Sequence, residues 1–112
     1  MTSVYYLDKK HTKPFSVTFD RKELGMLLSI YSQRVARGEW RDYAIDLLDD
    51  CAVFSIFRHA HETPLFAIIK AKGHKNRYDE FTVFNGQKRL TKSRNLPEAL
   101  SVFDKQSHNL NH

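Results

Sequence analysis

The chain has 112 residues, of which 41% are hydrophobic and 28% charged, a mixture typical of a globular protein rather than a disordered one. This length fits one domain and excludes two, while the single cysteine, Cys51, excludes an intrachain disulfide. The 18 Lys and Arg exceed the 13 Asp and Glu, and no stretch approaches the roughly 20 apolar residues that a membrane-spanning helix needs.

We expect residues 1–14 to form a flexible arm, residues 15–106 a single folded domain and residues 107–112 a frayed tail. The arm has no apolar segment of the kind found in secretory signals, which together with the lone cysteine predicts a cytoplasmic location. Directly after the arm, Phe15, Val17 and Phe19 alternate with polar residues, the pattern of a strand with one buried face.

The segment Asp20-Arg-Lys-Glu23 has the form of a capping box and predicts a helix to Arg37, ended by Gly38. The core face of this helix is one apolar stripe, formed by Leu24, Leu27, Leu28, Tyr31 and Val35. Met26 and Ile30 fall on the opposite side, beside a stripe of small residues. This position makes them a candidate interface for a second copy or a partner protein, and scattered apolar surface residues are the alternative interpretation.

The remainder of the chain predicts strands at residues 43–47, 51–59, 65–71, 78–84 and 87–91. The second and third of these are apolar on both faces, as central strands are. Asn85-Gly86 predicts a hairpin with a type I′ turn. Asn95-Leu-Pro-Glu98 is a second capping box, which opens a short amphipathic helix to about Lys105.

Together these elements predict an α+β fold with the order β-α-β-β-β-β-β-α. Its sheet is an antiparallel β-meander of five to six strands, because short connections join neighbouring strands. One long N-terminal helix and one short C-terminal helix accompany the sheet. One face of the sheet takes the first helix, and the other face takes either the second helix or another subunit.

Three blocks of sequence resemble a known family: Trp40–Asp46 (WRDYAID), Ala52–Arg58 (AVFSIFR) and Pro64–Phe66 (PLF). The family is an uncharacterised bacterial domain of unknown function of about this length, and the resemblance runs from about Val17 to Asp104. It implies a small stand-alone cytosolic protein with no assigned activity, and it supplies no catalytic or binding residues. The loop after Lys70 departs from the family pattern, so its basic residues are expected to be particular to this protein.

Positive charge concentrates between Arg58 and Arg94. In a meander, the loop at residues 72–77 and the end of the last strand lie at the same end of the sheet, which predicts a basic patch. Its members are Lys70, Lys72, Lys75, Arg77, Lys92 and Arg94, with Tyr78 nearby. Such a patch suits the phosphates of nucleic acid or another polyanion, or an acidic protein. The Asp49-Asp50 turn at that end and the lack of a nucleic-acid-binding motif favour the alternative, a solvated basic loop.

Three further groups of residues are weaker candidates for a functional site. Cys51 with His74 suggests a cysteine nucleophile, but Cys51 opens a buried strand and no Gly-rich turn offers an oxyanion hole. His59 and His61 have the spacing of two metal ligands, but a site needs three or four. Asp42 and Asp46 share one side of a strand without an opposing carboxylate, which indicates a structural role.

The sequence therefore predicts a small non-enzymatic binding or interaction protein with no metal, no cofactor and no membrane association. In the main interpretation its basic patch contacts nucleic acid or another polyanion. One alternative is a homodimeric or partner-binding structural module that uses the first helix or the open sheet face. The other is a cysteine-dependent enzyme.

Overall fold

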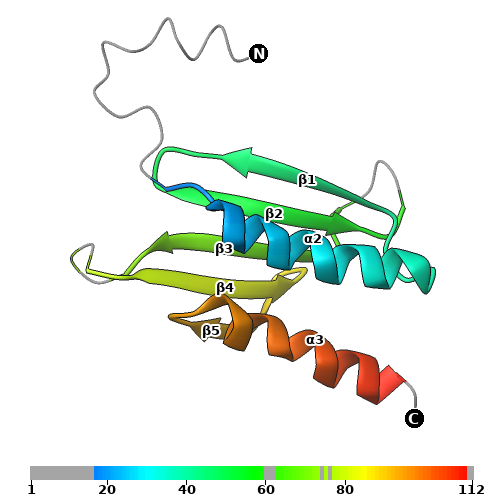
Figure 1. Ribbon diagram of the computed structural model, residues 1–112. Coiled ribbons are helices and arrows are strands. Elements are labelled where there is room, and N and C mark those ends of the chain that lie inside the picture. Colours follow the sequence, from blue (N-terminus) through cyan, green and yellow to red (C-terminus); the bar gives the residue numbers. More distant parts are fainter. Residues whose placement is uncertain (1–16, 60–62, 74, 76, 111–112) are drawn as a thin grey trace, which may run out of the picture.

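The computed structural model describes residues 17–59, 63–73, 75 and 77–110, with side chains described as far as Asp104. Figure 1 shows a sheet of five strands with two helices lying against it. In chain order the elements are α2 (Arg21–Ala36), β1 (Asp42–Leu47), β2 (Cys51–Phe57), β3 (Phe66–Lys72), β4 (Asp79–Asn85), β5 (Lys88–Ser93) and α3 (Leu96–Leu110).

The sheet is an antiparallel meander whose spatial order, β1-β2-β3-β4-β5, follows the chain. Every neighbouring pair of strands is antiparallel, and one register shift, between Val83 and Phe84, interrupts the pairing of β4 with β5. The α+β class, the meander and the two helices are therefore confirmed. Each strand begins and ends within two residues of its predicted position.

Both helices cover the same face of the sheet, whereas the sequence left open one helix on each face (Figure 1). Phe54 of β2 is paired with Ile68 of β3, which is paired with Val83 of β4, and all three side chains are fully buried on that face. Leu27 of α2 and Phe103 of α3 belong to the same core cluster. Within the described part of the chain, no helix covers the other face.

Helix α2 begins as predicted, but its last turn presents a different side chain to the core. The N–H of Glu23 donates to Oδ1 of Asp20 at 2.8 Å and the N–H of Asp20 donates to Oε1 of Glu23 at 2.9 Å, so the capping box is complete. Val35, predicted for the core, is 39% exposed, and Arg34 is buried in its place. The cause is a partner from α3: the guanidinium of Arg34 donates to the carbonyl of Phe103 at 2.6 Å.

The predicted first strand is wrong for the part that the structure describes, because residues 17–20 belong to no strand. Val17 and Phe19 are buried and Thr18 is exposed, so the alternation in the sequence does report burial. The carbonyl of Thr18, however, accepts a hydrogen bond from Nζ of Lys70 at 2.7 Å. A side chain takes the place of a neighbouring strand, and the segment packs on the core without joining the sheet.

Helix α3 is longer than predicted, since it extends to Leu110 instead of ending near Lys105. After Pro97 in its first turn, the segment contains no Gly or Pro that would end a helix. Its start is capped as expected: the N–H of Glu98 donates to Oδ1 of Asn95 at 2.8 Å. Much of the tail predicted at residues 107–112 is therefore helical.

The hairpin between β4 and β5 is confirmed, with a different turn type. The strands end at Asn85 and resume at Lys88, which leaves Gly86 and Gln87 as the loop. Gly86 has a φ of 62°, while Gln87 and Asn85 do not have positive φ. Type I′ needs positive φ at both loop residues, whereas type II′ needs it only at the first, where a glycine stands here.

Candidate anion-binding cleft

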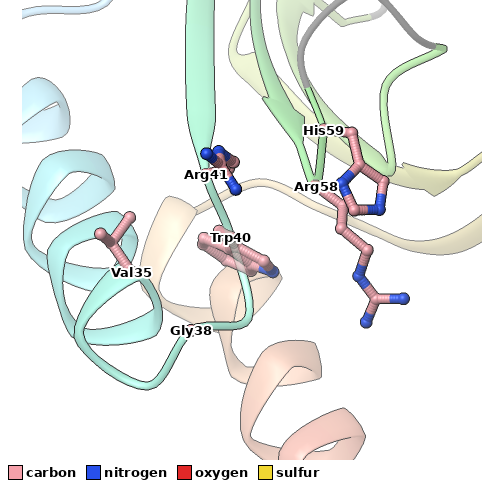
Figure 2. Close-up of a pocket in the computed structure, with 6 residues that line it drawn as sticks. All are labelled: Val35, Gly38, Trp40, Arg41, Arg58 and His59. Atoms are coloured by element: carbon pink, nitrogen blue, oxygen red, sulfur yellow. The ribbon is translucent and has the colours of Figure 1, made fainter.

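An open cleft of about 550 Å³ lies where the end of α2, the start of β1 and the end of β2 meet. Figure 2 shows Val35 and Gly38 on the α2 side of this cleft, Arg58 and His59 on the β2 side, and Trp40 between them. Arg41, just before β1, completes the lining. Because β1 begins where β2 ends, the cleft lies at the end of the sheet opposite to the predicted basic patch.

The floor of the cleft is the indole of Trp40, which the core holds in place. Its ring centroid lies 5.2 Å from that of Phe103 and 5.9 Å from that of Phe66, and the residue is only 4% exposed. The guanidinium carbon of Arg34 lies 5.4 Å from the centroid of the same ring, within the range of a cation–π contact. These contacts on several sides make the floor rigid.

A tight turn brings Trp40 against the end of α2. Gly38 has a φ of 76°, a conformation that favours glycine, and it directly follows the C-cap residue as predicted. The carbonyl of Arg34 accepts hydrogen bonds from the N–H groups of Glu39 at 2.9 Å and Trp40 at 3.4 Å. Nη1 of Arg34 also lies 3.0 Å from Oε1 of Glu39, so this carboxylate is already paired with a cation.

The cleft carries positive charge that no carboxylate of the described residues balances. The pairing of β1 with β2 ends at Asp42 and Phe57, and the N–H of Arg41 donates to the carbonyl of Phe57 at 2.8 Å, so Arg41 and Arg58 both lie just beyond this last pair. Both side chains are exposed, and neither forms a salt bridge with any carboxylate among the described residues. Two cations on the lining of one cleft repel each other, so an anion bound in the cleft would relieve this repulsion.

The arrangement suits the binding of an oxyanion. Guanidinium groups present forked N–H donors that match the geometry of phosphate and carboxylate groups. Among the residues that the structure describes, the lining contains no acidic side chain and no hydroxyl or thiol that could act as a nucleophile. In the described part of the chain, no group of three or more His, Cys, Asp or Glu side chains could hold a metal ion. His61, considered above as a metal ligand with His59, lies outside the described residues.

The structure places Lys70, one of the residues predicted to bind a polyanion, inside the fold. Its Nζ lies 2.7 Å from Oε1 of Glu23 and 3.9 Å from Oδ2 of Asp79, and its side chain is only 9% exposed. It points to the face of the sheet that the helices cover, because it is paired with the buried Phe81. Lys70 therefore connects β3 to the start of α2.

The other predicted cations do gather at one end of the sheet, together with carboxylates. Nζ of Lys72 lies 3.0 Å from Oδ1 of Asp79, and Nζ of Lys92 lies 3.5 Å from Oε1 of Glu80. Lys75 is exposed, as is Arg77. The binding of a polyanion by this patch stays a prediction, and much of its charge is already paired.

Tyr78 and Arg94 form a stack at this end. The guanidinium carbon of Arg94 lies 3.9 Å from the centroid of the Tyr78 ring. On the main chain, the N–H of Gly73 donates to the carbonyl of Tyr78 at 2.7 Å. A β-carbon on Gly73 would overlap the Tyr78 ring, so this position requires a glycine. His74, considered with Cys51 as a catalytic pair, lies outside the described residues.

The remaining candidates lie in ordinary packing positions. Met26 and Ile30 are half-buried and pack against the core, so their proposed role as an interface stays a prediction. Burial raises the pKa of the Cys51 thiol, and the charge of Asp50 raises it further. A raised pKa reduces the thiolate fraction on which cysteine nucleophiles depend.

Sequence reasoning missed the cleft because it summed charge along the chain, and the basic and acidic residues of positions 1–57 are equal in number. The signal that would have found it is symmetry about the Asp49-Asp50 turn. Arg41 and Arg58 are equally far from that turn, so a hairpin brings both to the same end of β1 and β2. The role of Trp40 as a floor depends on Phe103, which is far away in the sequence, and no local pattern reveals it.

Comparison with curated proteins and with solved structures gave no match. One family model matches residues 17–100, which include the three blocks from Trp40 to Phe66 that carry the resemblance described above. No helix in the described part of the chain is long and apolar enough to cross a membrane. Because the match spans most of its length, the chain belongs to the family described as "Protein of unknown function (DUF2794)".

Proposed function

We propose that this chain is a non-enzymatic binding protein that holds phosphate groups of nucleic acid in the cleft lined by Arg41 and Arg58. The observation that carries the proposal is the pair of exposed guanidinium groups that line one cleft at the end of β1 and β2, with no carboxylate partner among the described residues. The proposal includes the cytoplasmic location that the sequence predicts.

The electrostatics of the whole chain support a polyanion over a small neutral ligand. The formal net charge is +5 and the isoelectric point is about 9.4, so the protein attracts polyanions at neutral pH. Phosphate contacts supply most of the affinity in sequence-independent binding to nucleic acid. The cleft is open rather than enclosed, so a polymer backbone can cross it where a closed pocket would admit only a small molecule.

The experiment compares two variants of equal charge. Arg41→Ala with Arg58→Ala removes two exposed cations from the cleft, and Lys75→Ala with Arg77→Ala removes two exposed cations from the opposite end of the sheet. Labelled single-stranded and duplex oligonucleotides are titrated at about 50 mM salt, where phosphate contacts are weakly screened. Trp40 is the only tryptophan, so its fluorescence reports locally on the cleft.

We expect the wild type to bind with a change in Trp40 emission. The variant with Arg41→Ala and Arg58→Ala should lose this binding, and the variant with Lys75→Ala and Arg77→Ala should keep it. If the variant at Lys75 and Arg77 lost binding and the variant at Arg41 and Arg58 kept it, the site would instead be the predicted basic patch. Equal losses in both variants would indicate attraction by net charge alone and would contradict a site in the cleft. If neither oligonucleotide binds the wild type, the proposal fails.

A further inference from the structure

We propose that a second copy of this chain packs on the bare face of the sheet, with a two-fold axis that runs parallel to β3. The inference concerns the face opposite the helices and is independent of the cleft, which lies on the helix side. We propose a second copy rather than a different protein because the charges on this face are complementary to those on the same face of another copy.

The bare face has an apolar centre. It is formed by the residues that alternate with the core positions on β2, β3 and β4. Their side chains are half-buried, and no helix or strand of the described residues covers them. The larger apolar members are Val53, Phe57, Ile69 and Phe84, with Ala67 and Ala71 on the central strand. Half-buried apolar side chains on a sheet face without a covering layer are typical of an interface.

The two edges of the same face carry opposite charges. On β1, Asp46 is paired with Val53 and Asp42 with Phe57, so both carboxylates point to the bare face. On β5, Lys92 is paired with Thr82, which is paired with Ile69 on the same face. Arg89 is paired with Phe84 and adds a second cation to that edge. Across one row, the face therefore changes from acidic through apolar to basic.

This gradient selects the symmetry of a dimer. A two-fold axis parallel to β3 places β1 of one copy opposite β5 of the other, so Asp46 faces Lys92 of the second copy and Ile69 lies near the axis. An axis perpendicular to the strands would place β1 opposite β1 and bring like charges together, which is repulsive. Small residues on the central strand, Ala67 and Ala71, allow two sheets to approach to the usual separation of about 10 Å.

The size of the face is sufficient for a specific contact. Five strands that each occupy a width of about 4.8 Å, with six or seven residues that rise about 3.3 Å, cover roughly 24 Å by 20 Å. Two such faces would bury on the order of 1,000 Å² in total, at the lower end of specific interfaces. Nζ of Lys92 lies 3.5 Å from Glu80, but its side chain is 47% exposed and can reach a second partner.

The test is a charge swap followed by sedimentation equilibrium of the full chain across micromolar concentrations. Asp46→Lys places a cation opposite Lys92, and Lys92→Asp places an anion opposite Asp46, so each single variant should weaken the dimer at least about tenfold. The double variant restores opposite charges and should dimerise like the wild type. Within one chain the two positions are four strand spacings, roughly 19 Å, apart, beyond the Debye length of about 8–10 Å.

Rescue by the double variant would therefore report contact between copies. Ile69→Glu, near the axis, should give a monomer. Lys88→Glu, at the start of β5 beside the hairpin loop, serves as a control that leaves the dimer intact. A wild type that remains a monomer, whether its face is bare or covered by residues 1–16, would overturn the proposal. A dimer that the double swap fails to restore would overturn this arrangement as well.

Discussion

Nζ of Lys70 lies 2.7 Å from Oε1 of Glu23 and 2.7 Å from the carbonyl oxygen of Thr18. The same Glu23 oxygen also accepts the N–H of Asp20, the N-cap of α2. One lysine on a central strand thus holds the start of a helix and the segment that precedes it. The side chains of Lys70 and Glu23 are 9% and 13% exposed, so solvent screens this pair only weakly.

Replacement of Lys70 by Met should lower the free energy of unfolding by about 3 kcal/mol, because it leaves the Glu23 carboxylate without its cation in a buried site. Lys72→Met is the matched control, since Lys72 pairs with Asp79 at the surface and its side chain is 41% exposed. The control should lose less than about 1 kcal/mol. Urea unfolding curves of the two variants measure the difference, and equal losses would contradict a structural role for Lys70.

The sequence shows which face of its strand Lys70 occupies, but it does not show that the side chain is buried there. Ile68 and Lys70 fall on the same face of β3, which predicts that Lys70 points towards the helices. A lysine in a basic segment is nevertheless expected at the surface, because buried lysines are rare unless they are paired. The partner, Glu23, was recognised as part of a capping box, but its second role depends on tertiary packing that no local pattern specifies.

Gly73→Ala should destabilise the protein by about 1–3 kcal/mol, because the added methyl group would overlap the ring of Tyr78. Gly25→Ala is the control: nothing lies within 4 Å of a β-carbon there, and Gly25 stands in the exposed interior of α2. That change should stabilise the protein by about 0.5–1 kcal/mol, because alanine favours the helix. Thermal unfolding of both variants distinguishes destabilisation from stabilisation. An unchanged melting temperature for Gly73→Ala would contradict the close packing of Tyr78 against Gly73.

The strands and the first helix were predictable because each depends on local patterns. Two-sided apolar runs identified β2 and β3 as central strands, and the capping box located the start of α2. The prediction failed where a distant residue decides the outcome. Arg34 replaces Val35 in the core because the carbonyl of Phe103 lies within its reach. The segment at residues 17–20 stays outside the sheet because Lys70 satisfies one of its carbonyls.

Cys51 in the folded chain should react with iodoacetamide more slowly than in the urea-unfolded chain at mildly alkaline pH. Burial, followed by the charge of Asp50, raises the pKa of its thiol, so the reactive thiolate is scarcer in the folded state. The stabilising effect of the raised pKa is present below the pKa of the unfolded chain and declines as the pH rises through the folded pKa. Faster alkylation of the folded chain would instead support a cysteine nucleophile.

The cleft was predictable in principle from the symmetry of Arg41 and Arg58 about the turn that joins β1 and β2. Its walls were not, because Val35 and Gly38 come from the end of a helix whose position depends on the core. The electrostatic contrast between the two ends of the sheet also needed the structure. Lys72 and Lys92 meet carboxylates only through strand pairing.

The most direct measurement of the central claim is the salt dependence of binding to a single-stranded oligonucleotide. Each lost phosphate contact lowers the slope of log K against log salt by about 0.7. We predict that Arg41→Ala with Arg58→Ala reduces the magnitude of the slope by about 1.4, while Lys75→Ala with Arg77→Ala leaves it unchanged. Identical slopes for the wild type and the cleft variant would show that Arg41 and Arg58 contact no phosphate and would contradict the account.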